Sequence, residues 1–289
     1  MLEIKDATSF IENFEKTNER KVYRFPFIIS NGQEVAILMC KCGKNYISLP
    51  YLSQGIIETS PQKFDFNSLP KHWEIRDTKP HSQFVYTEKV NFELNLLENY
   101  NYSSDVRRKI KKAERNGIKI NNQTSEKLIK DFYYVYSKRM HKIGIPVVYK
   151  KYIRKKLSTN KTILFVAYKE NKPIGVAALD KITDNYFENV YFSTLSDFNY
   201  LYTSYALHSA IIDYCKENHA STYSFGRSTK ASSVYKYKQH WKVEEKQFYW
   251  SHNTKFKSIR NNKWFFSIWK KLPYPLTLII GGLITRRVF

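Results

Sequence analysis

The chain has 289 residues, 42% of them apolar, which is enough to bury a core in one large domain or in two modest ones. That apolar share excludes an intrinsically disordered chain. Lysine and arginine (48 residues) outnumber aspartate and glutamate (26 residues), and the formal net charge of +22 predicts attraction to a polyanion such as RNA, anionic lipid or a phosphorylated precursor.

Cysteine usage and the N-terminus bear on the cellular compartment. Cys40, Cys42 and Cys215 are an odd set without the spacing of metal ligands, so we expect reduced thiols and no metal site. The first residues contain no basic segment followed by an apolar one, so no secretory signal is recognised. We therefore expect a cytoplasmic protein.

The N-terminal part has the pattern of a helix followed by a β-meander. Residues 9–18 place Phe10, Ile11 and Phe14 on one helical face. Strands are predicted over residues 23–29 and 34–40, joined by an Asn31-Gly32 hairpin turn, and a third strand over 45–49.

The same order of elements recurs after residue 120. A helix is predicted over 126–144, then strands over 162–168, 174–180 and 185–194, followed by a helix over 200–217. We predict an α/β (α+β) fold of two related lobes, residues 1–115 and 116–289, each a mixed, mostly antiparallel sheet flanked by helices.

A strongly basic helix is predicted between the lobes. It begins near Ser103 and carries a narrow apolar stripe of Val106, Ile110 and Ala113. Its other faces are cationic, which is typical either of a solvated surface or of a phosphate-binding surface. The phosphate-binding interpretation assigns contacts with a polyanion to Arg107, Arg108, Lys111, Lys112 and Arg115.

The segment 223–241 carries the clearest candidate chemistry. A strand is predicted to end at Phe225, where Gly226 frees the backbone and residues 227–229 leave the sheet. Open α/β sheets place their chemistry at such strand ends. Tyr237, Lys238 and Trp241 follow, and this spacing is expected to hold a cation between aromatic rings, although a solvated lysine is the simpler alternative.

Several motifs, in order, resemble the FemA/FemB/FemX-like acyltransferases, which are built from GNAT-type folds. The C-terminal signature of that family is similar to Phe-Gly-Arg-Ser at 225–228, followed by aromatic-Lys at 237–238 and Trp241. Further similar segments are 48–55, Glu74-x-Arg76, the basic helix at 107–117 and 140–146. Lys242 and Ile56 stand where the family commonly has glycine, and the long helical arm of some members is missing.

The resemblance implies two GNAT-like lobes and transfer of an acyl group to an amine at the second lobe. Lys238 is then expected to stabilise negative charge on the carbonyl oxygen, with Arg227 as its catalytic partner. Arg227 and Arg76 are expected to bind an anionic part of a substrate. The remaining substrate-binding candidates are Tyr51, Ser228, Tyr237 and Trp241. Asp180 and Glu188 are the weak candidates for a general base.

The resemblance leaves the substrates open. The donor is expected to be aminoacyl-tRNA or acyl-CoA, used as a co-substrate with no tightly bound cofactor, and the acceptor an amine-bearing cell-envelope precursor at the inner membrane surface. Residues 193–202 contain no glycine, which argues against a CoA pyrophosphate loop. The alternatives are a CoA-dependent N-acyltransferase acting on an amino sugar in polysaccharide or lipid assembly, and a non-catalytic protein that binds RNA or an anionic membrane.

The C-terminal tail contains an apolar run over 272–284. It is shorter than the roughly 20 residues that span a bilayer. Two interpretations remain: a final strand and helix that pack on the second lobe, or an interfacial segment in peripheral contact with the anionic inner membrane. The second interpretation relies on Trp264, Trp269, Lys270 and Lys271.

Overall fold

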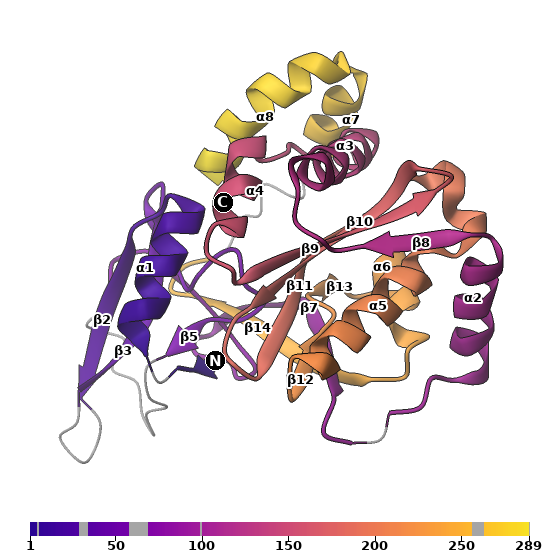
Figure 1. The fold of residues 1–289 in the computed structure, drawn as a ribbon. Helices are drawn as coiled ribbons and strands as arrows, with labels where there is room; N and C mark the ends of the chain where they lie inside the picture. The colour runs from indigo at the N-terminus through magenta and orange to yellow at the C-terminus, as the bar shows by residue number, and fades with distance from the viewer. Residues whose placement is uncertain (5, 29–33, 58–68, 99, 256–262, 289) are drawn as a thin grey trace.

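The computed structural model describes residues 1–4, 6–28, 34–57, 69–98, 100–255 and 263–288. Its first part contains two helices and seven strands within these described ranges (Figure 1). They are β1 (Leu2–Glu3), α1 (Ala7–Asn18), β2 (Val22–Ile28), β3 (Glu34–Cys42), β4 (Asn45–Ile47), β5 (Ile56–Ile57), β6 (Trp73–Asp77), β7 (Phe84–Asn95) and α2 (Ser104–Arg115).

The second part continues with strands and helices in alternation. In chain order they are β8 (Ile118–Asn121), α3 (Glu126–Ile143), α4 (Lys150–Leu157), β9 (Thr162–Lys169), β10 (Lys172–Lys181), β11 (Tyr186–Thr194), a 3-10 helix (Ser196–Leu201), α5 (Thr203–Glu217), β12 (Thr222–Ser224), β13 (Ser228–Thr229), α6 (Ser233–Gln239), β14 (Glu244–His252), α7 (Lys263–Lys271) and α8 (Tyr274–Val288).

The described strands form one sheet, in the order β1-β5-β3-β4-β6-β14-β7-β12-β11-β10-β9-β8, with β2 added to β3 and β13 added to β7. Most neighbours are antiparallel; β1/β5, β4/β6 and β11/β12 are parallel. The predicted mixed α/β class, with a mostly antiparallel sheet flanked by helices, is confirmed. The predicted meander strands β2 and β3 do pair, whereas the Asn31-Gly32 turn lies outside the described residues.

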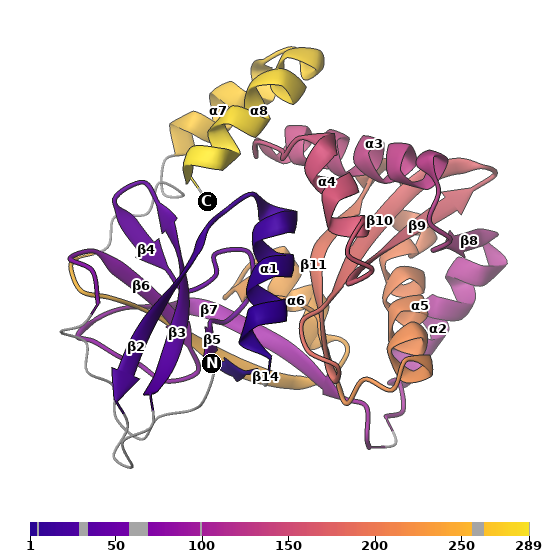
Figure 2. The same cartoon turned by 60° about the vertical axis from the view of Figure 1, so that its left-hand side comes forward.

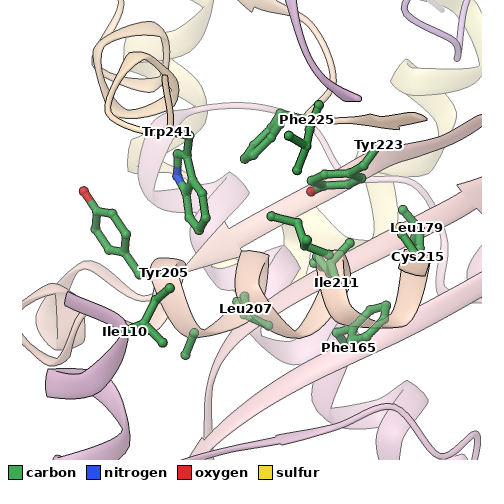
Figure 3. Packing of buried hydrophobic residues seen from close by; sticks show 14 of the residues in the cluster. Ile110, Phe165, Leu179, Tyr205, Leu207, Ile211, Cys215, Tyr223, Phe225 and Trp241 are labelled. Atoms are coloured by element: carbon green, nitrogen blue, oxygen red, sulfur yellow. The ribbon is translucent and has the colours of Figure 1, made fainter. Parts of the chain in front are cut away.

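The period-two alternation of strands separates the cores on the two sides of the sheet. In β10, Ala177 and Leu179 join the core beneath α5 and α2, while Val176 and Ala178 join the core beneath α3 and α4. Figure 3 shows the α5 side, where the rings of Phe225 and Trp241 lie 5.4 Å apart between their centroids. The predicted stripe of α2, Val106, Ile110 and Ala113, is buried in this core.

Strand β14 joins the two parts of the chain. It lies between β6 and β7 and pairs with both, although it begins at Glu244, 149 positions after β7 ends at Asn95. The sequence pattern did not predict this strand. Because the sheet runs through both parts, the lobe boundary after residue 115 stays a prediction.

The expectation that residues 227–229 leave the sheet is wrong for Ser228 and Thr229. They form β13 and pair with Val90 and Lys89 of β7. The reason is the length of β7, whose 12 residues accommodate β12 at one end and β13 further back. Between β12 and β13, it is Gly226 and Arg227 that turn away from the pairing with β7.

The C-terminal tail forms two helices, so the predicted final strand is wrong. Pro273 precedes α8 and Pro275 lies in its first turn, where a missing backbone N–H costs little. Both helices pack on α3. Of the helices in the described ranges, none combines the length and the hydropathy needed to cross a bilayer.

Candidate active site

A cavity of about 270 Å³ opens where the first part of the chain meets β11, α5 and α6. The first part contributes Tyr51 and Ser53. The second part contributes the remaining lining residues, among them Glu188, His208, Gly226, Arg227, Tyr237 and Lys238. The structure therefore brings five of the predicted site residues to one cavity: Tyr51, Glu188, Arg227, Tyr237 and Lys238.

Lys238 is buried at the wall of this cavity, with 5% of its surface exposed. Its Nζ donates a hydrogen bond to the Gly226 carbonyl oxygen at 2.5 Å and reaches the Arg227 carbonyl oxygen at 3.5 Å. Burial lowers the pKa of Lys238 from 10.5 to about 7; Glu188 opposes this change and Arg227 adds to it. The side chain is therefore poised to gain or lose a proton near neutral pH.

Gly226 sets the position of that carbonyl group. Its φ of 75° lies in the left-handed region, and a Cβ there would lie 2.5 Å from the Asn189 carbonyl oxygen. Only glycine fits both constraints. The ammonium is held by these backbone oxygens, and no cation–π contact of Lys238 is present in the part of the chain that the structure describes. The predicted placement between the rings of Tyr237 and Trp241 is therefore wrong.

Glu188 faces the same cavity from near the start of β11. Its Oε1 accepts hydrogen bonds from the Ser53 backbone N–H at 3.0 Å and the Ser53 hydroxyl at 2.8 Å. Its Oε2 is buried and makes no hydrogen bond within the described residues. Burial raises the pKa of Glu188 to about 7, while the Ser53 hydrogen bonds and Arg227 lower it.

Arg227 and Arg76 hold the loop that carries Tyr51 and Ser53. Arg227 Nη1 donates to the Leu52 carbonyl oxygen at 2.6 Å, and Arg76 Nη1 donates to the Pro50 carbonyl oxygen at 2.7 Å. Arg76 also pairs with Glu74 at 2.7 Å and does not line the cavity. Both guanidinium groups therefore position the loop in this structure.

The other predicted substrate-binding residues differ in their placement. Tyr51 lines the cavity and accepts a hydrogen bond from Arg20 Nε at 2.6 Å, and Tyr237 lines it while donating to the Ser204 carbonyl oxygen at 3.0 Å. Trp241 is fully buried in the core, where its ring stacks on Tyr205 (Figure 3). Ser228 is buried on β13, outside the cavity lining.

Ser53 and His208 are polar residues that line the cavity although neither was assigned to the site from sequence. Ser53 falls inside the 48–55 motif, and its position between Tyr51 and Gly55 was the available signal. His208 is buried, stacks on Phe192 and also lines the cavity; its place in the helix predicted over residues 200–217 gave no signal of this. Asp180, the other candidate base, is bound by Lys156 and Thr162 and does not line this cavity.

The cationic face of α2 is exposed and adjoins the N-terminal end of α5. Lys109 Nζ donates to the Tyr205 hydroxyl at 3.2 Å, and Lys112 Nζ lies 5.5 Å from the centre of the Tyr202 ring. Tyr205 in turn contacts Tyr237, with ring centroids 5.1 Å apart. The five predicted polyanion-binding residues, Arg107, Arg108, Lys111, Lys112 and Arg115, all have exposed side chains.

Comparison with known proteins shows the fold. The sequence matches no protein-family profile and no curated protein. FemX has a similar structure, with a TM-score of 0.60 over 82% of this chain and 90% of that chain at 10% identity. L-PGS from Bacillus licheniformis gives a TM-score of 0.52 over 100% of this chain and 98% of that chain at 11% identity.

A third similar structure is a C-terminal DUF2156 domain from Agrobacterium fabrum, from a protein named for lysylphosphatidylglycerol synthetase. Its TM-score is 0.58 over 83% of this chain and 86% of that chain, at 10% identity. At sequence identities this low, the comparisons show only that the fold is shared. The resemblance to Fem-like proteins predicted from the motifs is confirmed at that level.

Proposed function

We propose that the protein transfers an aminoacyl group from aminoacyl-tRNA to an amine of a cell-envelope component. The observation that carries the proposal is one cavity lined by a buried ammonium, Lys238, and a buried carboxylate, Glu188, within a fold shared with FemX. The names of the similar structures, FemX and lysylphosphatidylglycerol synthetase, support aminoacyl transfer to the cell envelope.

The two buried groups have complementary roles in this reaction. The acceptor nitrogen attacks the ester carbonyl carbon, and the carbonyl π electrons move to oxygen, where the Lys238 ammonium stabilises the charge. Glu188 takes the proton lost by nitrogen. The oxyanion then re-forms the carbonyl as the ester C–O bond breaks, and Glu188 returns that proton to the departing tRNA oxygen, which leaves as a hydroxyl. A positioned donor of this kind contributes about 3 kcal/mol to lowering the barrier, and a base with a pKa near 7 is suited to neutral pH.

Two features favour tRNA over CoA as the donor. The cationic face of α2 lies beside the start of α5, so a polyanion bound there is adjacent to Tyr205 and, through it, to Tyr237. The segment that leads into α5 is a 3-10 helix without glycine, and Tyr202 occupies a left-handed conformation with φ of 59°. Side chains therefore fill the position where a glycine-rich turn exposes backbone amides to a pyrophosphate.

The proposal is tested by following the acyl group. The purified protein is incubated with a pool of aminoacyl-tRNAs labelled in the amino acid, or with labelled acetyl-CoA, together with a nucleotide-linked amine precursor or extracted membrane lipids. We expect label to move from tRNA to an acceptor, and Lys238→Met to strongly reduce the transfer. Lys236→Met is the matched control, because Lys236 is two residues away on the same helix with an exposed side chain.

Two results would contradict the proposal. Transfer from acetyl-CoA with none from tRNA would reassign the donor and favour an N-acyltransferase. Binding of tRNA without turnover on either acceptor, with Lys238→Met indistinguishable from wild type, would favour a non-catalytic RNA-binding protein.

A further inference from the structure

Helices α7 and α8 form a hairpin at one edge of the molecule, beyond α3 (Figure 2). Hydrogen bonds attach its inner side to α3 and to the segment that follows. The Ser137 and Tyr274 hydroxyls lie 2.7 Å apart, and His141 Nε2 lies 2.9 Å from the Leu272 carbonyl oxygen. Tyr149 donates its hydroxyl hydrogen to the Ile279 carbonyl oxygen at 2.9 Å. One side of the hairpin is thus occupied by contacts with the rest of the protein.

The inner side of α8 carries small residues. A Cβ at Gly282 would lie 2.4 Å from the Tyr149 ring, and one at Gly281 would lie 3.0 Å from the Val147 backbone. Thr277 and Thr285 on the same side are 2% and 6% exposed. The helix therefore approaches the protein closely on the side that carries these small residues.

The outer side of the hairpin carries large apolar residues instead. Leu276, Ile279 and Leu283 recur at helical spacing on α8 and are 41%, 64% and 55% exposed. On α7, Trp264 and Ile268 lie four residues apart and are 71% and 40% exposed. Trp269 and Leu278 do pack inward, but a surface helix in water turns most of its apolar side chains to the core, so this exposed apolar row indicates a surface that is covered in use.

The charge of this region identifies what covers it. The sequence after Glu245 contains no aspartate or glutamate but nine lysine and arginine residues. Lys270 and Lys271 are exposed at the end of α7, next to the apolar outer side. Exposed tryptophan and aliphatic side chains in a segment whose charged residues are all cations match an anionic lipid interface, where the rings lie at headgroup depth and the cations contact lipid phosphates.

The length of the helices decides how such a surface meets a bilayer. Helix α8 has 15 residues and α7 has 9. At 1.5 Å per residue the longer helix reaches roughly 22 Å, less than the hydrocarbon core of roughly 30 Å. The hairpin can therefore lie in the interface but cannot span the membrane.

We propose that the α7–α8 hairpin docks this protein on the surface of an anionic bilayer. The side chains that enter the interface are Trp264, Ile268, Leu276, Ile279 and Leu283. The inference does not depend on the proposed reaction. If that reaction holds, docking has a consequence for the acceptor, because Thr285 of α8 and Tyr51 of the active-site cavity line a second cavity of about 90 Å³. The bilayer then lies on the Tyr51 side of the site, where a lipid-linked amine is the natural acceptor.

Vesicle flotation tests the proposal without any substrate. The full-length protein is mixed with vesicles of phosphatidylcholine alone, or of phosphatidylcholine with phosphatidylglycerol. We expect it to float with the anionic vesicles only, and to be released progressively as salt is raised. The double variant Ile279→Asp/Leu283→Asp should bind on the order of tenfold or more weakly, because it loses two inserted apolar side chains and adds charges repelled by the lipid.

Leu97→Asp is the matched control. Leu97 is 80% exposed and lies just after the end of β7, outside the hairpin. This variant should float like the wild type. All three proteins should have the same melting temperature, since every altered side chain is exposed.

Two outcomes overturn the inference. One is equal flotation of the wild type and the double variant. The other is a wild type that does not bind anionic vesicles and sediments as a dimer, while the double variant sediments as a monomer. The hairpin would then be a self-association surface. If the protein floats with anionic vesicles but transfers no acyl group, the proposed function is contradicted and the docking proposal is still supported.

Discussion

Replacing Lys238 by methionine should strongly reduce activity and stabilise the protein. Burial lowers the pKa of Lys238 from 10.5 to about 7. At about 1.4 kcal/mol per pH unit, carrying the ammonium in the folded state costs at most about 5 kcal/mol. Methionine has a similar length and no charge, so Lys238→Met removes this cost and leaves the Gly226 carbonyl oxygen without its donor, a loss of about 1–3 kcal/mol.

The sign of the effect depends on pH. Because the folded pKa of Lys238 lies below its unfolded value, the cost is fully present below about pH 7 and disappears as pH rises towards 10.5. The variant should therefore gain about 2–4 kcal/mol over the wild type at pH 6 to 7, and the gain should vanish near pH 10. Urea unfolding at several pH values measures this difference, with Lys236→Met as the control that changes nothing.

Activity should move in the opposite direction. Loss of one positioned donor to the developing oxyanion lowers kcat on the order of 100- to 1000-fold. A Lys238→Met protein that unfolds more easily than the wild type at pH 7, or that keeps more than about a tenth of its transfer rate, would refute the reasoning for this site.

Three further predictions concern the surroundings of Lys238. Glu188→Gln should lower kcat and remove the acid limb of the pH–rate profile near pH 7, and it should also stabilise the protein above that pH, because the raised pKa of Glu188 makes its ionised form unfavourable when folded. Gly226→Ala should lower the free energy of unfolding by about 1–3 kcal/mol and reduce transfer, since its Cβ would lie 2.5 Å from the Asn189 carbonyl oxygen at a φ of 75°. Neutralising four exposed cations of α2 should weaken tRNA binding in filter assays and reduce the slope of log affinity against log salt by about 3, while the same change at Lys127 and Lys130 of α3 should not; the four are Arg107, Arg108, Lys111 and Lys112.

Local patterns predicted the elements whose contacts are local or periodic. The stripe of Val106, Ile110 and Ala113 identified α2, and the helical pattern over residues 126–144 identified α3. Strand β14 was missed because it begins with Glu244, Glu245 and Lys246, and its pairing partners lie far away in β6 and β7. A strand stabilised by such distant neighbours carries little signal of its own.

The residues of the candidate site show the same difference between local sequence signals and distant contacts. Lys238 was found because its spacing from Gly226 and Trp241 follows a motif, and the carbonyl that binds its ammonium is 12 residues away. The loop-holding contacts of Arg227 and Arg76 could not be read from sequence, since their acceptors are backbone oxygens of residues 50 and 52. A side chain reveals its chemistry in the sequence, but a backbone acceptor is defined only by the fold.

The separation of Lys238 from Glu188 argues for chemistry over a structural role. Two buried opposite charges that served stability would form a direct ion pair, because pairing gives the smallest free-energy cost of burying either charge. Here Glu188 Oε1 is bound by Ser53 and Oε2 has no hydrogen-bond partner within the described residues, while Lys238 is held by backbone carbonyls. Each group thus keeps capacity directed at the cavity of about 270 Å³ that both of them line. A substrate with a carbonyl oxygen for the ammonium and an amine proton for the carboxylate would satisfy both groups at once.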